Sequence, residues 1–108
     1  MKAAVAEMPT KLADVKQNVQ TVEKYVREAA GHGASILVLP EFFTTGFAFS
    51  EMMYEAVVNS SEVEELLQSW SSTYQIAIGG SYLWYDRENG EIYNKYGLFF
   101  PGGRAVFS

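Results

Sequence analysis

The chain has 108 residues, 48% hydrophobic and 15% aromatic, which predicts one globular domain with a buried core and excludes a disordered chain. Thirteen acidic against eight basic side chains give a net charge of -5, so nucleic acid is not an expected partner. The absence of cysteine excludes disulfides, and a single histidine leaves too few ligands for a transition metal, so no metal or cofactor is expected.

The first predicted element is a strand over residues 2–8, a short apolar run that ends at the turn-forming Pro9. Glu7 and Pro9 interrupt this run too early for a signal peptide or a membrane span. We therefore expect a cytoplasmic protein that does not contact membranes.

A helix is predicted over residues 14–30, because apolar side chains recur there at alternating spacings of three and four. Asp14 with Gln17 three residues later is typical of a capping box at the start of a helix. Gly31 and Gly33 favour the end of the helix.

Residues 35–39 (SILVL) predict a second strand, and its unbroken apolar run indicates burial on both faces, as in a parallel sheet. A second long helix is predicted over residues 61–74, where Ser61 and Glu64 form another capping-box pattern, and residues 50–58 are the candidate for a short helix before it. Asn89-Gly90 is a strong hairpin signal. The remaining predicted strands are 75–85, 91–100 and 104–108.

A lone carboxylate, Glu41, stands directly after the second strand in the stretch SILVLPEFFTTGF. Burying a carboxylate beside Phe42, Phe43 and Phe47 is costly without a partner, so Glu41 either faces solvent or has a chemical task. Pro40 ends the strand and directs the next side chain out of its carboxyl end, where sites of α/β proteins lie. The local pattern alone leaves both interpretations of Glu41 open.

The stretch LVLPEFFTTGF resembles the glutamate motif of the carbon-nitrogen hydrolase (nitrilase and amidase) superfamily. The order of the later segments IAIGGSYLW and IYNKYGLFFPGG is also similar to that family. PEFFTTGFAF and PGGRAVF are most similar to the omega-amidase branch, which hydrolyses the terminal amide of 2-oxo acids. The resemblance covers essentially the whole chain.

The resemblance implies an α/β fold, with residues 1–108 as the N-terminal portion of a single incomplete α-β-β-α sandwich domain. The expected sheet is mixed and carries its helices on one face. In the family a Cys attacks a carbon-nitrogen bond, a Glu takes the thiol proton and a Lys stabilises the oxyanion. Glu41 matches the Glu, whereas the Lys and Cys are expected beyond Ser108, and Lys95 matches no catalytic position. The chain alone is therefore expected to be inactive.

Phe42, Phe43 and Phe47 are expected to supply the apolar setting that raises the pKa of a general base toward the working pH. The same three residues are predicted to line the substrate site. The expected substrate is a small-molecule amide or nitrile. Asn94 is expected to make a structural hydrogen bond, with contact to a ligand as the alternative.

Two other function classes stay open at this stage. A stand-alone, non-catalytic α/β domain would use its aromatic-rich surface to bind a protein or a ligand. A carboxylate-based glycosidase is a more distant alternative, because it needs a second acid at a fixed separation.

In the expected sandwich, one face of the sheet is covered mostly by residues outside this chain. An uncovered apolar face of this kind predicts that the chain forms a homo-oligomer or aggregates.

Overall fold

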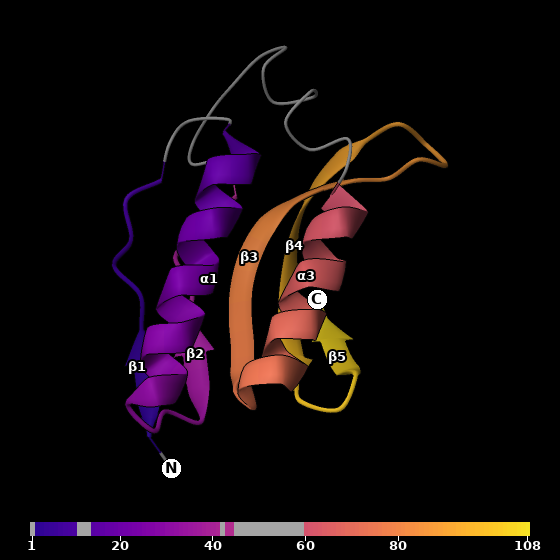
Figure 1. Cartoon of the computed structure of the whole chain (residues 1–108). Coiled ribbons are helices and arrows are strands. Elements are labelled where there is room, and N and C mark those ends of the chain that lie inside the picture. Colours follow the sequence, from indigo (N-terminus) through magenta and orange to yellow (C-terminus); the bar gives the residue numbers. More distant parts are fainter. Residues whose placement is uncertain (1, 11–13, 42, 45–59) are drawn as a thin grey trace.

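The computed structural model describes residues 2–10, 14–41, 43–44 and 60–108. Their helices and strands follow the predicted order along the chain (Figure 1). In sequence they are β1 (Ala3–Val5), α1 (Val15–Gly31), β2 (Ile36–Val38), α3 (Ser60–Tyr74), β3 (Ala77–Tyr85), β4 (Ile92–Phe100) and β5 (Arg104–Phe107). The short helix expected over residues 50–58 lies outside the described residues.

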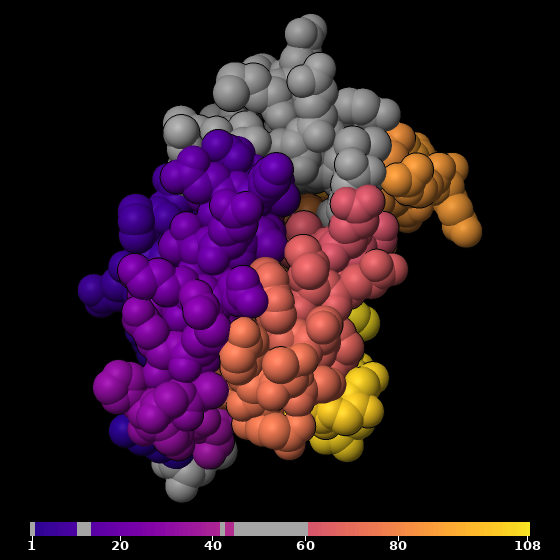
Figure 2. All heavy atoms as spheres, in the orientation of Figure 1, coloured from indigo at the N-terminus to yellow at the C-terminus, as the bar shows by residue number. Residues whose placement is uncertain are grey.

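The strands of this part of the chain form one mixed sheet in the order β1-β2-β3-β4-β5. β1, β2 and β3 are parallel, while β4 pairs antiparallel with both β3 and β5. Figure 1 shows α1 and α3 side by side across one face of this sheet, and the atoms of the two helices lie next to each other on that face in Figure 2. The prediction of an α/β fold with a mixed sheet and helices on one face is therefore confirmed.

Helix α1 begins and ends where its sequence predicts. The Asp14 carboxylate accepts a hydrogen bond from the backbone N–H of Gln17 at 3.1 Å and so caps the first turn. After the helix, Gly33 adopts a φ of +81°, and its N–H donates to the Ala30 carbonyl at 3.0 Å. Only glycine takes this left-handed conformation without strain, which makes Gly33 an effective stop signal.

The core lies between the two helices and the sheet. The apolar stripe of α1 packs inward as the periodicity predicts, and α3 contributes a second stripe. Members of this core include Val19, Val22, Val26, Val63, Leu67, Leu37, Ile78 and Phe99. Burial of these side chains is the main force that holds the helix layer on the sheet.

The opposite face of the sheet carries a continuous row of small and apolar residues. Backbone pairing places one residue of each strand in register, in the order Val5, Val38, Gly79, Leu98 and Val106. Val5 is 73% exposed and Val106 is 56% exposed, so no described residue covers the two ends of this row.

The start of α3 differs from the predicted capping box. The helix begins at Ser60, and the carboxylate of Glu64 accepts a hydrogen bond from Tyr82 and pairs with Lys95. A charged partner on the sheet thus outweighs a weak local cap. Elsewhere in the fold, the described helices contain no apolar run of the length that crossing a membrane requires.

Candidate active site

Glu41 lies at the carboxyl end of β2, where the position of Pro40 predicts it. The Leu39 N–H donates to the Gly79 carbonyl at 2.7 Å, which extends the pairing of β2 with β3 by one residue. The chain then turns at Glu41, whose side chain is exposed. This arrangement leaves the carboxylate available at the edge where parallel strands end.

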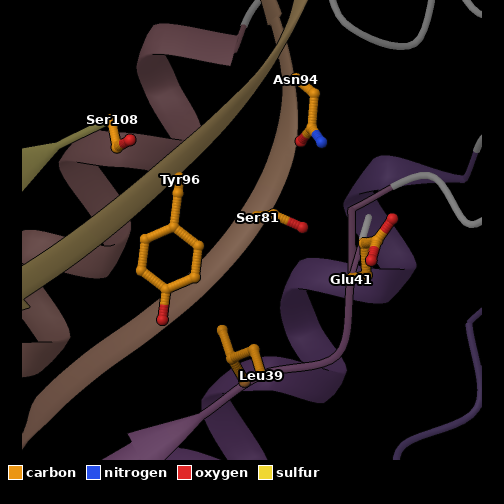
Figure 3. A pocket seen from close by; sticks show the side chains of 6 residues that line it. All are labelled: Leu39, Glu41, Ser81, Asn94, Tyr96 and Ser108. Atoms are coloured by element: carbon orange, nitrogen blue, oxygen red, sulfur yellow. The ribbon is translucent and has the colours of Figure 1, made fainter.

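The Glu41 side chain borders a pocket of about 470 Å³. Figure 3 shows the side chains around it, contributed by the end of β2, by β3, by β4 and by the residue after β5. Its lining residues are Leu39, Glu41, Ser81, Asn94, Tyr96 and Ser108. Apart from Leu39, every one of them carries a carboxylate, an amide or a hydroxyl group, so the described wall can bind a small polar ligand.

The pocket opens on the sheet face that the helices leave uncovered. Successive side chains of a strand point to opposite faces, and Tyr82 and Lys95 point toward α3, where both contact Glu64. Their neighbours Ser81 and Asn94 therefore point away from the helices. The pocket thus lies beside the apolar row on the same face of the sheet.

Of the three aromatic residues predicted to line the substrate site, Phe43 lies among the described residues. Phe43 is completely buried, and its ring meets the Tyr82 ring edge to face with centroids 5.8 Å apart. It packs beneath Gly80, where an added Cβ would come within 3.1 Å of the Phe43 ring. Phe42 and Phe47 lie outside the described residues, so their roles and that of Phe43 in binding substrate stay predictions.

A buried polar contact anchors the segment that follows Glu41. The side-chain amide of Asn18 on α1 donates to the Thr44 carbonyl at 2.7 Å, and both residues are almost fully buried. This bond holds the turn after Glu41 against the first helix. Sequence reasoning missed it, although a polar residue inside the apolar stripe of a helix is a usable signal for such a contact.

A second polar cluster lies on the helix side of the sheet, directly behind the pocket. The Lys95 ammonium pairs with the Glu64 carboxylate at 2.9 Å and lies 3.7 Å from the centre of the Trp84 ring. Tyr82 donates its hydroxyl to the same carboxylate, and burial together with this hydrogen bond raises the pKa of the Tyr82 phenol far above its usual range. The phenol therefore stays protonated and keeps donating.

Lys95 is thus held in an ion pair with Glu64 on the helix side of the sheet. No group of three or more His, Asp or Glu side chains suitable for a metal ion occurs among the residues that the structure describes.

The sequence matches the family model of the carbon-nitrogen hydrolases over residues 2–108. It is 30% identical over 92 residues to nitrilase homolog 2 of Dictyostelium discoideum, which covers 84% of this chain and 28% of that protein. It is 32% identical over 93 residues to omega-amidase NIT2 of Danio rerio, covering 82% of this chain and 32% of that protein.

The fold is similar to that of a solved amidase from Nesterenkonia sp., with a TM-score of 0.79 and 19% identity. That match covers 98% of this chain and 40% of the amidase chain. The chain therefore spans only about a third of the length of its curated relatives, 28% of one and 32% of the other. Because the family model matches nearly every residue, the chain belongs to the carbon-nitrogen hydrolase family.

Proposed function

We propose that this chain contributes the general base of an enzyme that hydrolyses carbon-nitrogen bonds other than peptide bonds. The observation that carries the proposal is the exposed Glu41 carboxylate at a polar pocket, in a chain that belongs to the carbon-nitrogen hydrolase family. These 108 residues contain no cysteine, so in this proposal the nucleophile belongs to a longer protein that includes them. The catalytic Lys of that protein would likewise lie beyond Ser108.

In the proposed reaction Glu41 takes the thiol proton while the sulfur attacks the amide carbon. The lysine stabilises the resulting oxyanion. When the carbon-nitrogen bond breaks, Glu41 returns the proton to the leaving amine, which departs as ammonia from a primary amide. Water, deprotonated by Glu41, then hydrolyses the thioester and releases the acid and the thiol.

The proposed substrate class is a small amide, with the terminal amide of a 2-oxo acid as the specific candidate. The similarity to the Danio rerio omega-amidase supports this choice, as do the PEFFTTGFAF and PGGRAVF stretches. The pocket also has the size and the polar lining that suit a small amide.

Ammonia release tests the proposed function. The natural full-length protein should release ammonia from 2-oxoglutaramate, whereas the purified 108-residue chain should not exceed background, because a base without its nucleophile forms no covalent intermediate. A full-length protein without activity on amides or nitriles would contradict the proposal. It would favour the alternative of a non-catalytic binding domain. Activity of the 108-residue chain by itself would contradict the proposal that the nucleophile lies outside these residues.

The isolated 108-residue chain is further proposed to self-associate through the apolar row. The exposed ends of the row, Val5 and Val106, form a sticky surface beside the edge strand β5. Light scattering at high micromolar concentration should report an oligomer or aggregates.

The Val106→Lys variant should shift this mass toward the monomer, because each contact would then bury an unpaired ammonium. The matched control Gln20→Lys adds the same charge on the exposed surface of α1 and should leave the mass unchanged. A stable wild-type monomer that binds no apolar dye would contradict the proposal.

A further inference from the structure

We propose that Asn94 binds the amide group of the substrate across the pocket from Glu41 and makes the site selective for primary amides over nitriles. The proposal rests on the proposed function for its reaction. Its binding step, however, is measurable without turnover.

The position of the Asn94 side chain is the first support. Asn94 lies on β4, is exposed, and borders the same pocket as Glu41. Figure 3 shows its amide, the Ser81 hydroxyl and the Glu41 carboxylate around the same space. The structural hydrogen bond that the sequence suggested for Asn94 does not form with any residue in the described part of the chain. Its donor and its acceptor are both available to a ligand.

The chemistry of the carboxamide group is the second support. Asn94 offers an N–H₂ donor and a C=O acceptor, the same two groups that a primary amide carries. The two amides can therefore pair through two N–H···O bonds. A nitrile offers only an acceptor nitrogen and can form a single N–H···N bond with the Asn94 amide. An ionised Glu41 only accepts hydrogen bonds, so it cannot supply the donor that a substrate carbonyl needs.

Two other polar groups of the pocket are less suited to this task. Tyr96 extends over Gly79, where its hydroxyl would lie 3.0 Å from an added Cβ, and Figure 3 shows that hydroxyl pointing toward Leu39. Ser81 has an interaction of its own. Asn94 therefore matches the proposed substrate better than these two residues, because its carboxamide has a free donor and a free acceptor, as a primary amide has.

The cluster behind the pocket holds Asn94 in place. Lys95, the next residue of β4, is fixed on the helix side by Glu64 and Trp84. Antiparallel pairing of Asn94 with Leu83 fixes the same stretch of backbone within the sheet. A side chain on a rigid strand loses little freedom when a ligand binds, so its hydrogen bonds contribute more fully to affinity.

The charge of the pocket wall indicates which end of a substrate binds here. Its described lining contains the Glu41 carboxylate and no lysine or arginine. Such a wall repels a substrate carboxylate and accepts a neutral amide. If the substrate is the amide of a 2-oxo acid, its amide end lies at Asn94 and its acid end points away from this wall.

The test measures binding of two uncharged probes, propionamide and propionitrile, to the natural full-length protein. Turnover is removed by replacing the nucleophilic cysteine, or the protein is used unmodified if it shows no hydrolysis. Ligand-observed NMR titrations then give both dissociation constants for the wild type and for Asn94→Leu, which has the same branched shape but no hydrogen-bonding group.

We expect Asn94→Leu to weaken propionamide binding by about thirtyfold, the effect of two hydrogen bonds, and propionitrile binding by only about fivefold, the effect of one. The control Gln20→Leu removes an exposed carboxamide from α1 and should change neither. An equal change for both probes, unchanged propionamide binding in Asn94→Leu, or a wild type that does not bind propionamide would each overturn the proposal. A selective loss of propionamide binding in a protein without hydrolytic activity would support the role of Asn94 in binding amides. It would at the same time reject the proposed reaction.

Discussion

Replacing Glu41 with Gln in the full-length protein should lower turnover by about a hundredfold or more while the protein stays folded. The amide keeps the size and shape of the side chain but cannot take the proton of a thiol. Glu41 is exposed at a turn, so the change removes no packing and leaves no buried charge without a partner. The rate of ammonia release under saturating amide, together with the melting temperature, checks both parts of this expectation.

A matched control separates the loss of a base from the loss of a negative charge. Glu28 is an exposed carboxylate on α1, outside the pocket lining, and Glu28→Gln should leave turnover unchanged. Turnover of Glu41→Gln near the wild-type rate would assign Glu41 to the surface of the protein, the other interpretation that its sequence leaves open.

Phe43→Ala should destabilise the protein by about 3–5 kcal/mol, the range found when a buried aromatic side chain is truncated. The ring is completely buried and packs against Tyr82 and Gly80, so its removal leaves a cavity beneath the strand that carries Ser81. Urea unfolding followed by tryptophan fluorescence measures the loss as a lower midpoint at an unchanged m-value.

Two further variants distinguish a core role for Phe43 from a role in binding substrate. Leu66 is 41% exposed on α3, and Leu66→Ala should cost less than about 0.5 kcal/mol. Phe43→Leu keeps most of the volume and should retain the KM of the wild type. A raised KM in Phe43→Leu at nearly unchanged stability would instead support the sequence-based hypothesis that this ring contacts substrate.

The candidate site is only partly predictable from the sequence. Glu41 could be placed because its position depends on local features, a buried strand that ends at Pro40. Asn94 and Ser81 could not be assigned to the same pocket, since their approach depends on how β3 pairs with both β2 and β4. The link between Glu64 and Lys95 joins a helix to a strand far along the chain, and the sequence suggested a local cap for Glu64 instead.

Local signals in the sequence determined which segments become helices and strands. Period and caps decided α1, an unbroken apolar run decided β2, and Asn89-Gly90 decided the hairpin between β3 and β4. These signals depend only on residues that are close in sequence, so they can be recognised without knowledge of the rest of the fold.

Only the tertiary structure decided which face of β3 and β4 each side chain occupies. IYNKYGLFF carries apolar residues at both odd and even positions, so alternation alone does not select the face that meets the helices. A shift of one residue in pairing would exchange the two faces, moving Asn94 under α3 and Lys95 into the pocket. Packing of α3 on Phe99, with the contacts of Glu64 to Tyr82 and Lys95, selects the register that leaves Asn94 beside Glu41.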